Sequence, residues 1–157
     1  MDILQRAVTR LAAVRRRPCQ LAAIETHMLA FEQGARDLDS ETVNEANYAF
    51  HMAIGAAAQS SHLAAAYGRS LLESLRIAYV CFSEHSELDE RLEAHLDATM
   101  QDHRLLFEAI TTGDPDAAEL VAGSHVDLFR GRIVTTLLST DTARRVSAKL
   151  ASADTER

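Results

Sequence analysis

The stretch QDHRLLFEAITTGDPDAA, residues 101–118, decides the fold predicted for the rest of the chain. Apolar residues leading into it and within it recur at helical spacing: Leu96, Met100, Leu106, Phe107 and Ile110. Gly113 is a typical helix stop, Asp114 is a good N-cap, and Pro115 suits the first turn of a new helix. The sequence therefore predicts two antiparallel helices joined by a tight turn.

Each of these two helices carries a histidine toward its inward face. His103 lies near the apolar stripe of the first helix, and His125 shares a face of the second with Ala117, Val121 and Leu128. Because antiparallel neighbours bring their inward faces together, the two imidazoles are expected to lie close to each other. This arrangement is half of a possible metal site, and the remaining ligands must come from elsewhere in the chain.

The whole chain is predicted to be all-α. No segment shows a convincing strand-like alternation, and glycine and proline are confined to a few positions that suit helix ends. We expect an antiparallel bundle of six to seven helices, with residues 1–140 as one domain and residues 141–157 as a short helix or frayed tail. The six main helices are predicted over about 2–16, 18–34, 41–58, 61–82, 89–112 and 115–138.

Length and composition limit the function classes. A chain of 157 residues with 47% hydrophobic residues can bury the core of one domain. The net charge of −7 argues against direct binding to the DNA backbone or to an anionic membrane. No apolar run approaches the roughly 20 residues that span a bilayer, and no signal peptide is recognisable. We expect a cytoplasmic protein with Cys19 and Cys81 as buried or half-buried thiols.

The third predicted helix adds two polar residues to an apolar stripe. Asn47 and His51 lie one turn apart on the face that also carries Phe50. Polar side chains on a buried face are costly unless a partner satisfies them. Together with His103 and His125, they offer three imidazoles and one oxygen donor. Such a set suits a divalent transition metal such as zinc, nickel or manganese.

Spacing alone leaves a second interpretation open, in which each histidine is a core residue bonded to a backbone carbonyl. The sequence also lacks the arrangements expected of common enzymes, such as a Ser-His-Asp set or a glycine-rich phosphate loop. Acid–base chemistry needs an inward carboxylate, and Asp102 and Glu108 are placed off the inward line of their helix. These observations argue against an enzyme.

At these residues the chain resembles the effector-binding C-terminal domain of FadR-type regulators in the GntR family of transcription regulators. That family shows an Asp followed four residues later by His, then a Glu-His pair that leads into an Ala-Ile and Gly-Asp turn, and then a final His. The corresponding segments here are NYAFH (residues 47–51), DHRLLFEAITTGD (residues 102–114) and His125. The resemblance extends over about residues 4–138.

The resemblance implies a dimeric helical bundle around a central cavity. A metal held by the Asp equivalent and three histidines would help to bind a small organic acid there. Arg76 resembles the family's arginine on the fourth helix that faces this cavity. In the family, the effector changes how an attached N-terminal winged-helix domain holds DNA. Here Asn47 replaces the Asp, which removes one anionic ligand, and we expect no DNA-binding domain within this chain.

The leading hypothesis is therefore a metal-dependent sensor domain for a small carboxylate. The rival from another class is a helical-bundle metalloenzyme whose three-histidine site leaves positions open for a substrate. A third hypothesis is a structural dimerisation module. The absence of an inward general base favours the sensor over the enzyme.

Overall fold

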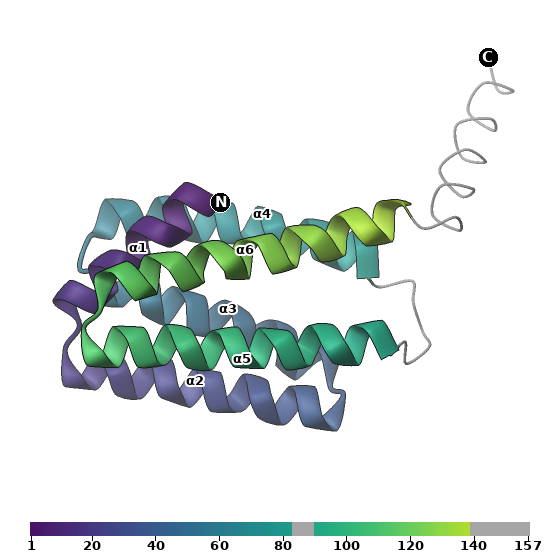
Figure 1. Ribbon diagram of the computed structural model, residues 1–157, viewed down its shortest axis with the longest axis horizontal. Coiled ribbons are helices and arrows are strands. Elements are labelled where there is room, and N and C mark those ends of the chain that lie inside the picture. The colour runs from purple at the N-terminus through teal and green to yellow at the C-terminus, as the bar shows by residue number, and fades with distance from the viewer. Residues whose placement is uncertain (83–89, 139–157) are drawn as a thin grey trace, which may run out of the picture.

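The computed structural model describes residues 1–82 and 90–138, and within these ranges every regular element is a helix. This result confirms the all-α prediction, and the helices form one elongated bundle (Figure 1). Their bounds are α1 Asp2–Arg15, α2 Pro18–Asp37, α3 Ser40–Ala57, α4 Ser61–Phe82, α5 Glu90–Thr112 and α6 Pro115–Leu138. The predicted tail over residues 141–157 lies outside the described residues.

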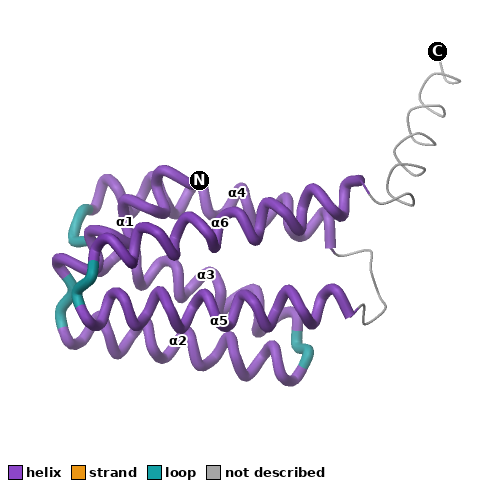
Figure 2. Tube along the Cα trace, viewed as in Figure 1, coloured by secondary structure: helices purple, strands orange, loops and turns teal. Residues whose placement is uncertain are grey.

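The bundle is built from antiparallel neighbours connected by short turns (Figure 2). Helices α2 and α3 form one hairpin, α5 and α6 form another, and α1 lies along α6. The apolar stripes of the helices meet in one main core, whose largest fully buried members include Ile24, Phe50, Ile54, Tyr67 and Leu106. Residues from all six described helices thus bury one another, as the amphipathic pattern predicted.

The turn between α5 and α6 has the predicted chemistry. Gly113 adopts a left-handed backbone conformation with φ of 76°, which a residue with a side chain rarely adopts. The Asp114 carboxylate accepts hydrogen bonds from the backbone N–H groups of Asp116 and Ala117, at 3.1 and 2.9 Å. Pro115 is the first residue of α6. This turn fixes the relative height of the two helices, and hence of their histidines.

Helix α2 ends later than predicted. The sequence suggested a stop at Gly34, but the helix continues to Asp37, and Leu38 takes the left-handed conformation with φ of 55°. Gly34 instead allows a close approach to α3, because a Cβ atom there would lie 2.8 Å from Thr42 Cγ2. The correction has a physical basis: glycine is selected at this position for contact between helices, a requirement that local sequence does not reveal.

An ion pair between a buried carboxylate and a largely exposed guanidinium joins α2 to α5. The Glu32 side chain is only 5% exposed, and its two oxygens accept hydrogen bonds from Arg104 at 2.6 and 2.8 Å. The two-point contact with Arg104, followed by the weaker one with Arg36, lowers the pKa of Glu32. The pair ties α2 to α5 only one residue from His103.

Two sequence expectations on exposure and membranes can be compared with the structure. Cys19, expected to be at least half buried, is an exposed free thiol, because the second residue of α2 faces away from the bundle. The side chain of Cys81 lies outside the described part. Among the described residues, no helix combines the length and the apolar character that a membrane crossing requires.

Candidate metal centre

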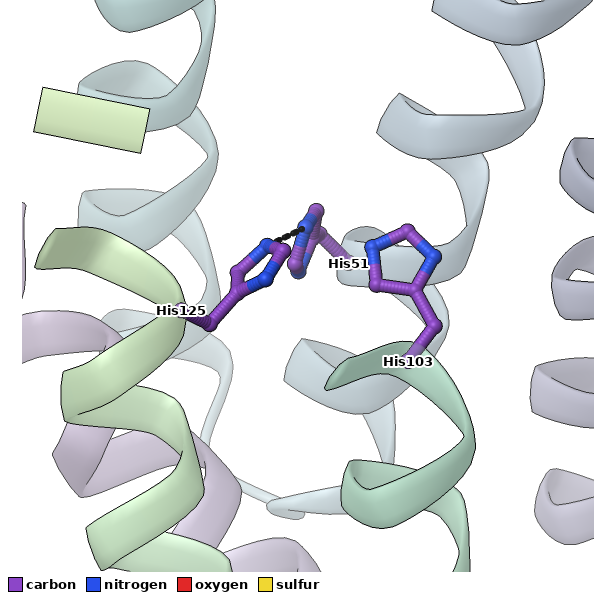
Figure 3. A group of neighbouring side chains, drawn as sticks. All are labelled: His51, His103 and His125. Atoms are coloured by element: carbon purple, nitrogen blue, oxygen red, sulfur yellow. Dashed lines mark hydrogen bonds between the residues drawn. The ribbon is translucent and has the colours of Figure 1, made fainter. Parts of the chain in front are cut away.

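Three of the four predicted metal ligands meet in the middle of the bundle. His51 comes from α3, His103 from α5 and His125 from α6, and all three are buried. One ring nitrogen from each lies within 4.8 Å of the others. Figure 3 shows the three rings converging from their separate helices on one small region. The structure therefore brings together side chains that are up to 74 residues apart in sequence.

The α5–α6 turn explains why His103 and His125 face each other. His103 lies ten residues before Gly113, and His125 lies twelve residues after it. At about 1.5 Å of rise per residue, the two positions differ by only about 3 Å in height along the bundle. The third histidine arrives on α3, which packs chiefly against its hairpin partner α2 and also against α1 and α4.

The separation of the nitrogens suits a small metal ion. His51 Nε2 and His125 Nε2 are 3.3 Å apart. Zinc binds histidine nitrogen at about 2.0–2.1 Å, so two nitrogens on one tetrahedral ion lie about 3.4 Å from each other. At this distance one of the two Nε2 atoms donates a hydrogen bond to the other. A metal would replace that proton with little movement of either ring.

Asp102 orients His125 from the outside. Its Oδ2 lies 3.3 Å from His125 Nδ1, and its side chain is mostly buried at 19% exposure. A carboxylate at Nδ1 favours the proton on that nitrogen and leaves the Nε2 lone pair directed at the other histidines. The sequence pattern placed Asp102 away from the apolar stripe of α5. It was missed because it reaches sideways to α6, although its position next to His103 was a usable signal.

Several polar atoms at the site are buried without a hydrogen-bond partner. They are Asn47 Oδ1, His51 Nδ1 and both ring nitrogens of His103. Each such atom costs on the order of 1–3 kcal/mol when no partner satisfies it. Because neither ring nitrogen of His103 has a hydrogen-bond partner, His103 is not a core histidine bonded to a backbone carbonyl. A metal ion held by the three histidines would satisfy one nitrogen of His103, so these histidines fit such an ion.

Burial keeps the central imidazoles neutral. The pKa values of His51 and His103 lie well below the usual value, chiefly because burial penalises the charged ring. The neighbouring His125 lowers both further by charge repulsion. Burial also lowers the pKa of His95 on α5 to about 4, with Arg132 and His125 contributing. Neutral imidazole is the form that binds metal.

Aromatic contacts fix the orientation of His103. Its ring stacks on Phe50 with centroids 4.2 Å apart and meets Phe31 at 4.7 Å. Phe50 also contacts His51 edge-on at 5.2 Å. Because Phe50 and Phe31 are themselves fully buried, the histidine rings have little rotational freedom. This packing favours a pre-arranged site.

Arg76 does not lie where the family resemblance placed it. Its side chain is 77% exposed and donates to Glu73 at 3.2 Å, instead of facing the histidines. A buried guanidinium needs an anion, and in this structure Arg76 pairs with Glu73 on the exposed face of α4. The expectation of an inward Arg76 is corrected for this structure, while its part in ligand binding stays a prediction.

Comparison with known proteins decides the family. The model of the FCD domain, the C-terminal domain of GntR-family regulators, matches residues 1–128. The chain belongs to the FCD family. The chain is also similar to the galactonate operon transcriptional repressor of Escherichia coli strain K12, with 34% identity over 125 residues. That match covers 77% of this chain and 49% of the repressor.

Membership of the FCD family decides against the enzyme hypothesis. FCD domains belong to transcription regulators, so the chain is a regulator domain and not an enzyme. The resemblance to the effector-binding domains of GntR-family regulators is confirmed. The chain spans about half the length of the curated relative it matches, so the activity of a whole regulator is a matter for proposal.

Proposed function

We propose that this FCD domain senses a small carboxylate with the help of a divalent transition metal, either zinc, nickel or manganese. The observation that carries the proposal is the convergence of His51, His103 and His125 within 4.8 Å at a fully buried position. The buried, unpartnered Asn47 oxygen supports a fourth ligand one turn from His51. When bound, the metal would supply a positive centre that attracts a carboxylate.

The neutral ligand set makes an anionic effector important. Asn47 and three imidazoles carry no charge, whereas the Asp of the family pattern would carry one negative charge. The negative charge of Asp102 lies on the far side of the His125 ring, so it offsets the metal charge only at a distance. A divalent charge in a buried site is costly without nearby anions. The effector carboxylate therefore stabilises the metal, and the metal stabilises the effector, so their affinities are coupled in both directions.

Arg76 remains part of this proposal as a second contact for the carboxylate. Its present partner Glu73 forms an exposed ion pair, and such pairs contribute only about 0–1 kcal/mol. Exchanging Glu73 for an effector carboxylate would therefore cost little electrostatically. In a complete regulator, we propose that the effector signal reaches DNA through an N-terminal winged-helix domain outside this chain, which places the protein in the cytoplasm.

The metal proposal is tested by calorimetric titration of zinc with and without a carboxylate. The acids include acetate and, because of the similarity to the galactonate operon repressor, galactonate. We expect His103→Gln to abolish tight binding and Asn47→Asp to strengthen zinc binding in the absence of acid by about tenfold or more. Asp102→Asn should weaken zinc binding by about 10–100-fold, because it releases the orientation of His125.

The control is His62→Gln, which removes an exposed histidine on α4. This variant should bind zinc like the parent protein. Arg76→Ala should lower the affinity for the carboxylic acid without changing the affinity for zinc alone. The metal proposal fails if the parent protein and His103→Gln bind zinc equally. The coupling argument fails if the acid leaves zinc affinity unchanged in the parent protein.

We also propose that the domain forms a homodimer through α1 and α4. The start of α1 meets the second half of α4, where the Ser74 hydroxyl donates to Met1 Sδ at 2.8 Å. Close to this contact, Ile3, Leu72 and Ile77 are 82%, 47% and 50% exposed. Large apolar side chains gathered on neighbouring elements are typical of an interaction surface.

The dimer prediction is checked by light scattering. We expect twice the monomer mass for the parent protein, and the monomer mass for a variant with Leu72→Glu and Ile77→Glu, because two buried charges per subunit oppose association. Leu120→Glu on α6 is the matched control, since Leu120 is 71% exposed on another helix. The dimer proposal is contradicted if the parent protein stays monomeric in an assay at tens of micromolar.

A further inference from the structure

The last turns of α1 bond to three other helices at one end of the bundle. The α1–α2, α3–α4 and α5–α6 connections all lie at this end (Figure 2). Helices α3, α5 and α6, which carry the three histidines, therefore begin or end close to the end of α1. Arg10, Arg15 and Arg16 each reach a different one of these helices. The metal centre by itself does not account for this arrangement.

Arg15 joins α1 to α3. Its Nη1 atom donates a hydrogen bond to the backbone carbonyl of Ala58, the C-cap of α3, at 3.1 Å. In return, the side-chain amide of Gln59 donates to the backbone carbonyl of Arg15. A cationic side chain at a helix C-terminus satisfies a free carbonyl and interacts favourably with the helix dipole. Ala58 lies seven residues after His51, which is about 10 Å along α3.

Arg16 joins α1 to α5. Its Nη1 atom donates to the carbonyl of Ala13 at 2.5 Å, and its Nη2 atom donates to the carbonyl of Thr111 in the last turn of α5 at 3.2 Å. Gly113 makes room for this contact, because a Cβ atom there would lie 2.6 Å from Nη2 of Arg16. Thr111 lies eight residues after His103, which is about 12 Å along α5.

Arg10 joins α1 to α6. Its Nη1 atom lies 2.5 Å from Asp116 Oδ1 and 3.0 Å from Glu119 Oε2, in the first two turns of α6. Both ion pairs are partly exposed, so each contributes little alone. Glu119 lies six residues before His125, about 9 Å along α6. Each histidine thus lies two to three turns from a contact made by an arginine of α1.

Metal binding would act on these contacts through the helix backbones. The three ring nitrogens lie within 4.8 Å of one another, whereas nitrogens that share one tetrahedral zinc ion lie about 3.4 Å apart. The ring of His103 is wedged between Phe50 and Phe31, with centroids 4.2 and 4.7 Å away, so it cannot close the gap by turning alone. A small shift of α5 closes it, and because a helix is stiff along its axis, the carbonyl of Thr111 moves with it.

We propose that Arg10, Arg15 and Arg16 form a clamp through which α1 regulates the metal centre. The clamp holds α3, α5 and α6 at the spacing that lets the three histidines share one ion, and a bound ion in turn holds the clamp closed. The inference rests on the proposed metal site and adds a means of regulating it. Because such coupling is reciprocal, any event that draws the end of α1 away from the other helices weakens metal binding.

Hydrogen exchange on the parent protein tests the effect of metal on the clamp. The amide of Arg16, which donates to the carbonyl of Ala12 at 2.9 Å, should exchange on the order of tenfold more slowly with zinc than with a chelator. The internal control is the amide of Asp39, which donates to the carbonyl of Gly34 at 2.9 Å in the α2–α3 turn at the other end of the bundle. Its exchange rate should not change. Equal slowing at both amides, or no slowing at Arg16, overturns the clamp.

Calorimetric titration of zinc into variants tests the effect of the clamp on metal. Arg15→Met and Arg16→Met keep the apolar stem of the side chain and remove its donors, and each should lower zinc affinity on the order of tenfold. Arg16→Lys keeps a cation that can donate to one carbonyl, so it should recover part of that loss. The matched control is Arg69→Met, which removes an exposed arginine on α4 and should bind zinc like the parent protein.

The outcomes separate the clamp from a structural role and from the metal site itself. If the two Met variants are less stable in a chelator but bind zinc like Arg69→Met, the arginines are structural and the clamp is overturned, while the metal site stands. If the parent protein does not bind zinc, the metal proposal fails, and the clamp fails with it. If a Met variant does not fold, hydrogen exchange on the parent protein decides the case.

Discussion

Replacing Phe50 with alanine should lower the free energy of unfolding by about 3–5 kcal/mol, the range measured for large-to-small changes at buried aromatic positions. Phe50 is 0% exposed and lies in the main core. It also stacks on His103 at 4.2 Å and contacts His51 at 5.2 Å. The cavity left by the ring would therefore lie directly against the candidate metal centre, and both imidazoles would gain freedom to rotate.

Chemical unfolding with and without zinc measures both consequences. We expect Phe50→Ala to lose stability in a chelator and also to gain less stability from zinc than the parent protein gains, since a site that is no longer pre-arranged binds metal less tightly. The control is Leu120→Ala, because Leu120 is 71% exposed and its loss should change stability by less than about 0.5 kcal/mol. Equal zinc stabilisation in Phe50→Ala and the parent protein would contradict the positioning role of Phe50.

Acid should unfold the metal-free domain steeply below about pH 6.5, the usual histidine pKa. In the folded protein, burial holds the pKa values of His51 and His103 well below that value. Once the pH falls below the histidine pKa of the unfolded chain, the unfolded chain therefore binds two more protons than the folded chain. Stability is complete above that pH and declines by up to about 2.7 kcal/mol per pH unit as the pH falls further.

His95 and Glu32 extend the same trend to lower pH. The pKa of His95 is lowered to about 4, so a third proton adds to the slope between about pH 6.5 and 4. The pKa of Glu32 is also lowered, so the stabilising pair with Arg104 is complete above the ordinary pKa of a glutamate and is lost as the pH falls through the depressed value. Every one of these groups makes the folded state weaker in acid.

Urea unfolding between pH 8 and pH 5 in the presence of a chelator measures the slope without competition from metal. His103→Gln should reduce the slope by about 1.4 kcal/mol per pH unit, because one buried titrating group is removed. His62→Gln removes an exposed histidine and should leave the slope unchanged. If the free energy of unfolding of the parent protein does not change between pH 6.5 and pH 5, protonation of the central histidines does not destabilise the fold, and the prediction is wrong.

The sequence by itself determined the helices and the position of the histidines along them. Apolar spacing is a local property, so it predicted all six main helices. The Gly113–Asp114–Pro115 turn has one favourable geometry, and this geometry fixed the heights of His103 and His125. The same local reasoning placed Asn47 and His51 one turn apart, and the family resemblance rested on these same segments.

The tertiary structure decided what each side chain meets, because that depends on how every helix is rotated about its axis and on which neighbour lies opposite. Asp102 reaches His125 across a helix boundary that no local pattern reveals. Gly34, predicted as a helix end, serves close packing against Thr42. Arg76 turns to solvent and pairs with Glu73 on the exposed face of its own helix. Tyr67 is fully buried beside His51, and only the fold shows that its hydroxyl has no hydrogen-bond partner there.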